Sequence, residues 1–143
     1  MSMFVISGSY LYGFDDGSIY STSQSIYLDF THNGPVIKIH HNKTTQNLVT
    51  AASTGEIIVA YGDPNEGFSF NFSYQYHECS IVSLIVHENQ IISSDLCGIV
   101  VEFNMAEQVL VDIILHPNYQ SNNKVMISHY MGGFFISAVE NGS

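Results

Sequence analysis

Short runs of β-prone residues, separated by glycine turns, recur along this chain. In residues 48–59, LVTAASTGEIIV, a strand at 48–50 leads through small residues to Gly55, which supplies a tight turn, and residues 57–59 return as a second strand. The same pattern lies around Gly17, Gly98 and Gly142. These glycines are spaced by roughly 40 residues, a period that indicates stacked supersecondary units.

A second pattern fills the space between the glycine turns. An alternating strand leads to a histidine and then to another apolar strand, in residues 25–39, 67–86 and 109–127. The histidines are His32, His77 and His116. Each period therefore predicts roughly four strands and no helix.

Two stretches give further expectations. In residues 68–76 the aromatic side chains alternate with polar ones, so we expect one aromatic face that covers another sheet or a partner. Residues 3–9 and 10–13 predict a strand that starts in the middle of a unit. We therefore expect the first unit to lack the innermost strand of the later ones.

These features resemble the WD-repeat β-propeller family. The repeat of that family places a His before the innermost strand, then a strand that ends in small residues, an Asp-Gly-like turn, and a strand that closes on Trp-Asp. Here the turn is held by Asp16-Gly17, Thr54-Gly55, Cys97-Gly98 and Asn141-Gly142. The nearest occupants of the Trp position are Thr22, Tyr61 and Phe103, while Asp63 and Asn104 lie near the final Asp, and the chain contains no Trp.

The resemblance implies an all-β, β-propeller-like fold of antiparallel four-stranded meander blades in an incomplete ring. It implies a single segment over residues 1–143, with approximate units 1–33, 34–78, 79–123 and 124–143. Counting strands gives about three blades, whereas propellers close with roughly four to eight. We therefore expect open sheet edges that are covered by a partner chain, by a second copy, or by the rest of a longer gene product.

Few residues carry charge, and those that do are mostly acidic. The chain has 13 Asp and Glu against three Lys, and its net charge is −10. Nucleic acids are bound through clustered Lys and Arg, and anionic membranes attract basic segments, so the sequence argues against both as partners. Because charged residues make up only 11% of the chain, we expect another protein to cover part of its surface.

The cysteines bear on the cellular compartment. Cys79 and Cys97 are the only two, and the sequence shows neither a signal-peptide pattern nor 18 consecutive apolar residues. Two cysteines in that context are more typical of reduced thiols than of a disulfide. We therefore expect free thiols and a cytoplasmic location.

The sequence predicts no catalytic residue, no metal site and no cofactor. His40 and His41 are adjacent on a strand and so point to opposite faces, and nothing in the sequence orders Ser, His and Asp into a triad. The glycines lie in β-turns without a following helix, so no phosphate loop is predicted. In the resembling family the repeated His bonds within its own blade, which gives His32, His77 and His116 a structural role.

What remains is surface for protein partners. In the resembling family, one rim of the propeller is built by the hairpin tips and by the loops that enter the innermost strands. The corresponding tip residues are Asp15, Asp16, Ser53, Thr54, Leu96 and Cys97, and the loop residues are Asn33, Gly34, Glu78 and Cys79. The sequence thus predicts a non-catalytic interaction scaffold within a larger assembly. The alternative is a small β-sandwich or barrel with a ligand-binding or hydrolytic pocket lined by His and Tyr, which would need crossing strand pairs instead of a meander.

Overall fold

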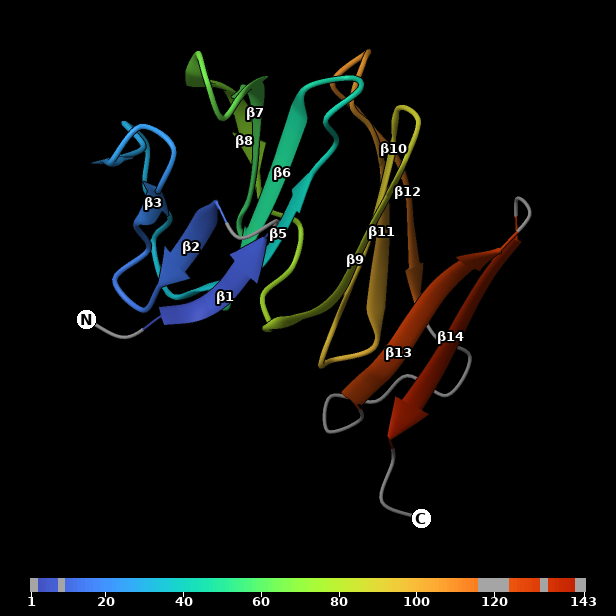
Figure 1. Ribbon diagram of the computed structural model, residues 1–143. Coiled ribbons are helices and arrows are strands. Elements are labelled where there is room, and N and C mark those ends of the chain that lie inside the picture. The colour runs from blue at the N-terminus through green and yellow to red at the C-terminus, as the bar shows by residue number, and fades with distance from the viewer. Residues whose placement is uncertain (1–2, 8–9, 116–123, 132–133, 141–143) are drawn as a thin grey trace. The chain divides into compact units, whose positions relative to one another are not determined.

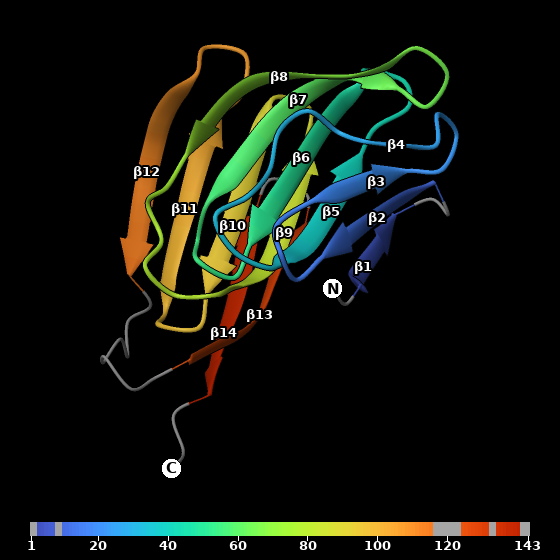
Figure 2. The ribbon, with the colours of Figure 1, turned by 90° about the vertical axis from the view of Figure 1, so that its left-hand side faces the viewer.

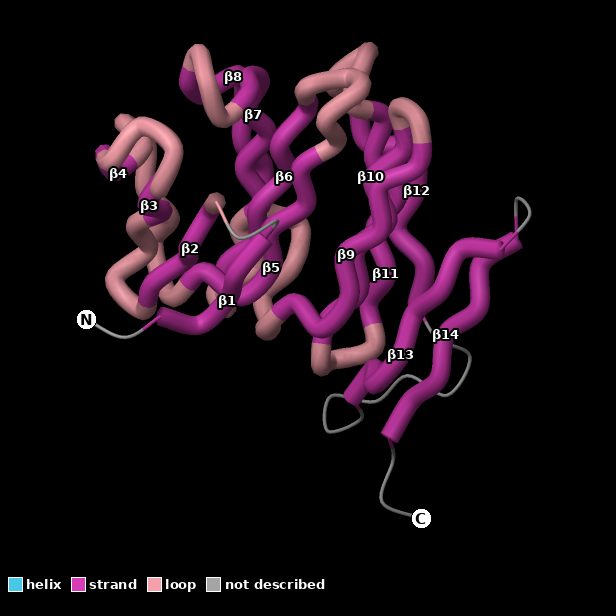
Figure 3. Tube along the Cα trace, in the orientation of Figure 1, coloured by secondary structure: helices cyan, strands magenta, loops and turns pink. Residues whose placement is uncertain are grey.

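The computed structural model describes residues 3–7, 10–115, 124–131 and 134–140, with side chains described within residues 10–114 (Figure 1). Strands joined by short turns make up this part of the chain, as the tube in Figure 3 shows. No helix of membrane-crossing length and apolarity occurs among these residues. His116 and the predicted turn at Gly142 lie outside the described residues.

The strands of the described residues form four antiparallel sheets. The first sheet contains β1 (Met3–Ser7), β2 (Leu11–Phe14), β3 (Ile19–Ser21) and β4 (Ile26–Tyr27). The second contains β5 (Val36–His41), β6 (Asn47–Ala52), β7 (Ile57–Asp63) and β8 (Gly67–Tyr74). The third contains β9 (Ile81–His87), β10 (Gln90–Asp95), β11 (Ile99–Asn104) and β12 (Val109–Leu115), and the last is the hairpin of β13 (Lys124–Met131) and β14 (Phe134–Glu140).

Within each sheet, the described strands pair in the order in which they follow one another in the sequence, so each sheet is a simple meander (Figure 2). This confirms the predicted fold class of antiparallel, propeller-like blades. A β-sandwich or barrel would place strands from distant parts of the sequence side by side in one sheet, and the described strands contain no such crossing pair. The prediction of a sandwich or barrel is therefore not supported.

The chain divides into two compact units, Met1–Gln75 and Tyr76–Ser143. In the first unit, β1 and β2 lie beside β5. In the second unit, β13 lies beside β9 and β10. The finer boundaries 1–33, 34–78, 79–123 and 124–143 stay a prediction.

The expectation that the first unit lacks an innermost strand is wrong. β1 pairs with β2 and lies beside β5, the first strand of the next sheet, so the first sheet has four strands. Residues 3–14 are apolar on both faces and lack an Asp-Gly turn, which is why the sequence pattern does not separate them into two strands. Only the pairing of Ser7 with Leu11 shows where one strand ends and the next begins.

Apolar side chains of the first two sheets form the core of the first unit. The buried members are Leu11, Ile19, Leu28, Phe30, Val36, Leu48, Ile58, Ala60 and Phe68. Burying a side chain the size of leucine or phenylalanine stabilises a fold by about 1.5–3 kcal/mol. This cluster therefore holds two neighbouring blades together as one body.

The aromatic face predicted for residues 68–76 is broken by a β-bulge. Phe72 pairs with Val59 and Phe70 with Ala60, so Asn71 is the extra residue on β8. Adjacent positions on β7 point to opposite faces, so Phe70 and Phe72 cannot share one face. Phe68 is buried, whereas Phe70 remains 50% exposed.

Candidate functional site

In the first unit, the tip of the β2–β3 turn packs against the loop that enters β5. The carbonyl of Gly17 accepts a hydrogen bond of 2.8 Å from the backbone N–H of His32. Gly17 has φ +89°, and a Cβ there would overlap the carbonyl oxygen of His32. Glycine is required here for both reasons. The contact places Asp15 and Asp16 next to the loop.

The same turn fixes the carboxylate of Asp16. Its Oδ1 accepts hydrogen bonds from the N–H of Ser18 at 3.0 Å and from the Ser18 hydroxyl at 2.5 Å. These two hydrogen bonds lower the pKa of Asp16, because they favour its charged form. The exposed tip therefore carries a fixed negative charge.

The β6–β7 turn joins the same group of residues. The hydroxyl of Thr54 donates to Oδ1 of Asn33, and the N–H of Ser53 donates to the carbonyl of Pro35 at 2.9 Å. The N–H of Asn33 donates to Glu56 Oε1 at 3.1 Å. Asp15, Asp16, Asn33, Ser53 and Thr54 thus form one surface, the first rim cluster, in which every member is exposed or half-buried.

A buried histidine supports this cluster from below. His32 Nδ1 donates to Glu56 Oε1 at 2.8 Å, and the Thr50 hydroxyl lies 2.7 Å from Nε2. Burial lowers the pKa of His32, although the neighbouring Glu56 carboxylate acts in the opposite direction. A neutral ring donates through Nδ1 and accepts from Thr50 through Nε2, which satisfies both nitrogens.

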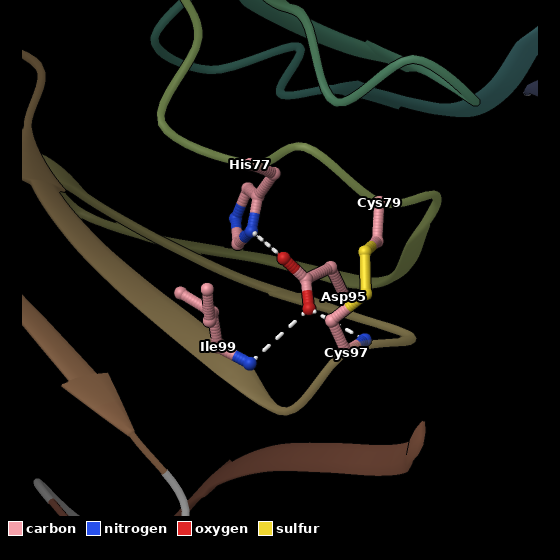
Figure 4. Close-up of a disulfide and its surroundings, with 5 residues drawn as sticks. All are labelled: His77, Cys79, Asp95, Cys97 and Ile99. Atoms are coloured by element: carbon pink, nitrogen blue, oxygen red, sulfur yellow. Dashed lines mark hydrogen bonds and ion pairs between the residues drawn. A yellow bond between two sulfur atoms is a disulfide. The ribbon is translucent and has the colours of Figure 1, made fainter. Parts of the chain in front are cut away.

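The second unit repeats this arrangement around His77. His77 Nδ1 donates to Asp95 Oδ2 at 2.7 Å, and Ser93 Oγ lies 2.7 Å from Nε2. The other Asp95 oxygen accepts the N–H groups of Cys97 at 2.8 Å and Ile99 at 3.1 Å (Figure 4). The carboxylate of Asp95 therefore organises the whole β10–β11 turn.

The structure corrects the expectation that no Ser, His and Asp are ordered into a triad. Ser93, His77 and Asp95 have that order, and Thr50, His32 and Glu56 repeat it in the first unit. The exposed fractions of Ser93 and His77 are only 0% and 1%, so Ser93 cannot meet a substrate. The separation in sequence between the His and its hydroxyl partner is similar in the two units, 18 residues in the first and 16 in the second, and this similarity is the signal that could have revealed the arrangement.

A disulfide joins Cys79 to Cys97, with 6.0 Å between their Cα atoms, so the prediction of two reduced thiols is wrong (Figure 4). The reason is strand register. Ile81 of β9 pairs with Asp95 of β10. Cys79 lies two residues before Ile81, and Cys97 lies two residues after Asp95. Because the strands are antiparallel, both cysteines lie at the same end of the sheet, within disulfide range.

The disulfide creates a second rim cluster, made of Glu78, Leu96 and Cys97. It ties the loop that enters β9 to the β10–β11 turn, and the N–H of Leu96 also donates to the Ser80 carbonyl at 3.0 Å. Glu78 is exposed, and Leu96 is half-buried. The predicted partner-binding residues therefore fall into two clusters, one in each compact unit.

Two sets of described side chains of the types that bind metal ions are engaged in other contacts. Cys79, Asp95 and Cys97 form the one His, Cys, Asp or Glu group of metal-site dimensions among these residues, but both sulfurs are in the disulfide and both Asp95 oxygens accept hydrogen bonds. His41 donates from Nε2 to the Gly62 carbonyl at 2.9 Å and accepts from the Tyr10 hydroxyl at 2.6 Å. These contacts are structural.

Sequence reasoning missed a groove in the first unit. A cavity of about 300 Å³ lies between the β4 region and the start of β8. Its lining residues are Gln24, Ile26, Tyr27, Leu28, Asp29, Glu66, Gly67, Phe68 and Ser69. No motif marks these positions, because the two walls are about 40 residues apart in the sequence and meet through blade packing.

No protein-family model matches the chain, and no curated protein matches it. Solved structures do match. The computationally designed protein Ika4 is 18% identical, with 97% of this chain and 89% of that chain covered and a TM-score of 0.73. The C-terminal WD40 domain of Sif2 is 18% identical, with 92% of this chain and 38% of the Sif2 chain covered and a TM-score of 0.70. The WD40 β-propeller domain of Doa1 is also 18% identical, with 95% of this chain and 47% of the Doa1 chain covered and a TM-score of 0.70.

These likenesses establish the fold, which is that of β-propeller blades. This chain spans less than half of the length of the two WD40 propeller chains. At this level of identity the comparisons concern architecture alone, and no site residue is transferred from them.

Proposed function

We propose that this chain is a non-catalytic scaffold for protein–protein interaction, a partial propeller that works within a larger assembly. The observation that carries the proposal is the surface of β12. Five of its apolar side chains are 37% to 51% exposed. They are Val109, Leu110, Val111, Ile113 and Ile114. Water-exposed apolar residues in such a row are typical of a surface that another chain covers.

The position of β12 supports the same conclusion. It is the last strand of its sheet and pairs with β11 alone among the described strands. An unpaired strand edge with apolar side chains is a template for association, and folded proteins cover such edges. The neighbouring hairpin lies beside β9 and β10, at the other side of this sheet.

The share of the solved propeller chains that this chain covers, and its net charge, support a more specific proposal about its partners. Propellers close with roughly four to eight blades, and the chain covers 38% of the Sif2 and 47% of the Doa1 propeller chains. We therefore propose that further blades, from a partner, from a second copy or from the rest of a longer chain, complete the ring. A net charge of −10 favours neutral or basic protein surfaces over nucleic acid or anionic membrane.

The cytoplasmic location stays a prediction. The Cys79–Cys97 disulfide counts against it, because the cytosol keeps most thiols reduced.

The test compares two acidic substitutions of equal charge. Val111→Asp places a carboxylate on β12, and Tyr61→Asp places one on β7, where the side chain is 54% exposed. Tagged chains are expressed in the native source, and the assemblies are weighed by native mass spectrometry. We expect the original chain and Tyr61→Asp to be recovered with the same identified subunits, and Val111→Asp to lose them. A monomeric original chain would refute the proposal.

A further inference from the structure

The groove between β4 and β8 has the dimensions of a binding site. Its volume of about 300 Å³ lies at the lower end of the range for ligand pockets. The two walls belong to neighbouring sheets of one compact unit. Gln24 spans from one wall to the other, where its Nε2 donates to the carbonyl of Asn65 at 3.3 Å. The side-chain amide of Gln24 also fills the space in which a Cβ of Gly67 would lie, so the walls approach closely there.

The groove combines an apolar floor with exposed apolar walls. Leu28 and Phe68, both nearly buried, belong to the core cluster and line the groove. Ile26 and Tyr27 are 52% and 49% exposed, although they form β4. The ring of Tyr27 is held by edge contact with Tyr20, at 5.1 Å between centroids, so the wall is pre-organised.

The edge of β4 is open to a further strand. Tyr27 pairs with Tyr20, and Ile26 with Ser21, both on β3. Among the described strands β4 pairs with β3 alone and ends the first sheet. An extended segment that adds to such an edge gains main-chain hydrogen bonds, and alternate side chains then enter the neighbouring pocket.

The negative charge of the groove favours a partner with basic side chains. Asp29 and Glu66, both exposed, line it from opposite walls. No Lys, Arg or His is among its lining residues. Cationic side chains complement this pair of carboxylates, and a guanidinium can also stack on the face of an aromatic ring such as Tyr27.

From these features we infer that the groove binds an extended protein segment in which basic and apolar residues alternate. The apolar side chains rest on Ile26, Leu28 and Phe68, and a Lys or Arg lies between Asp29 and Glu66. The inference builds on the proposed scaffold function, because it names a class of partner. It uses a surface in the first unit and not β12.

The test titrates the 143-residue protein against fluorescein-labelled octapeptides by fluorescence anisotropy. The first peptide alternates Arg with Val, the second alternates Glu with Val, and the third alternates Arg with Pro. We expect binding of the Arg-Val peptide alone. The Glu-Val peptide has the wrong charge, and the Arg-Pro peptide keeps the charge but lacks half of the N–H groups needed for strand addition. Equal binding of the Arg-Val and Arg-Pro peptides would overturn strand addition.

Matched variants locate the site. The double variant Asp29→Asn with Glu66→Gln should weaken binding of the Arg-Val peptide by about fivefold, as expected for two exposed ion pairs. The control, Glu88→Gln with Glu107→Gln, removes the same charge from exposed positions of the second unit and should leave binding unchanged. Equal weakening in both double variants would show that the peptide is attracted to the net charge of the protein alone, and would overturn the inference that the groove is its binding site.

A further variant separates this inference from the scaffold proposal. Val111→Asp should leave binding of the Arg-Val peptide unchanged, because β12 belongs to the second unit. If the peptide fails to bind while the native assembly still depends on Val111, the groove inference fails alone. If the native chain is monomeric but binds the peptide through Asp29 and Glu66, the scaffold proposal fails and the groove remains.

Discussion

His77 Nδ1 lies 2.7 Å from Asp95 Oδ2, and neither side chain is exposed to solvent. The Asp95 carboxylate also receives the N–H groups of Cys97 and Ile99. One carboxylate thus holds a histidine from the loop before β9 and the turn after β10. The equivalent contact in the first unit, from His32 to Glu56, is 2.8 Å long and partly exposed on the Glu56 side.

The first prediction follows from the contacts of Asp95. Asp95→Ala removes the acceptor of the His77 Nδ1 hydrogen bond and of two backbone N–H groups, where the side chains of Asp95 and His77 are fully buried. We expect the free energy of unfolding to fall by about 3–5 kcal/mol. Asp112→Ala, at an exposed position of β12, should change it by less than about 0.5 kcal/mol. Urea denaturation measures both, and similar small changes would contradict the role given to Asp95.

The second prediction concerns pH. Burial lowers the pKa of His32 in the folded chain below its ordinary value of 6.5. The unfolded chain therefore binds more protons than the folded chain just below pH 6.5, and stability falls as pH decreases from 6.5 towards the lower folded pKa. Burial and the neighbouring His41 lower the pKa of His40 in the same direction.

Substituting each histidine in turn distinguishes the contributions of His32 and His40 to the pH dependence of stability. Urea midpoints between pH 7.5 and pH 5 should fall for the original chain, and less steeply for His32→Gln and for His40→Gln. A midpoint that rises with decreasing pH would contradict the lowered pKa of the buried His32 and of the half-buried His40.

The third prediction concerns the disulfide. The cysteines are 18 residues apart, and closing a loop of about this length stabilises a fold by about 3 kcal/mol. Addition of dithiothreitol should therefore lower the urea midpoint of the original chain and leave that of the double variant Cys79→Ser with Cys97→Ser unchanged. Alkylation of the unreduced protein, unfolded in urea, should add no mass. If two alkyl groups are added without reductant, the disulfide is absent in solution.

The fourth prediction compares Gly17 and Gly34, two glycines next to residues of the first rim cluster. Gly17→Ala forces a side chain into φ +89° and against the backbone carbonyl of His32, and we expect a loss of more than about 2 kcal/mol. In Gly34→Ala the new Cβ would lie 2.7 Å from the methyl carbon of Thr54, a side chain that can shift at the cost of its hydrogen bond to Asn33, and no backbone atom is in the way. Gly34→Ala should therefore cost less, and a reversed order would contradict the packing of the β2–β3 turn on the His32 loop.

Sequence periodicity was sufficient to predict the class of fold. The glycine turns at Gly17, Gly55 and Gly98 all have positive φ, as their pattern requires. Alternating and apolar runs mark most of the strands. The apolar run at the start of the chain predicts a strand, but its division into β1 and β2 depends on the pairing of Ser7 with Leu11, which no turn motif marks.

The sequence could not predict the contacts that depend on how strands and loops are placed next to one another. The disulfide depends on the register of Ile81 with Asp95, and the order Ser93–His77–Asp95 depends on a loop folding over β10. The groove depends on two blades packing side by side. That the two rim clusters bind a partner stays a prediction.

The measurement that tests the central claim most directly is hydrogen–deuterium exchange of β12, Val109–Leu115. The backbone N–H groups on its outer edge lack a strand partner among the described residues, so they should exchange rapidly in the isolated protein. In the assembly purified from the native source we expect these amides to exchange at least about tenfold more slowly, because another chain pairs with or covers the strand. Unchanged exchange rates at β12 within a verified assembly would contradict the account.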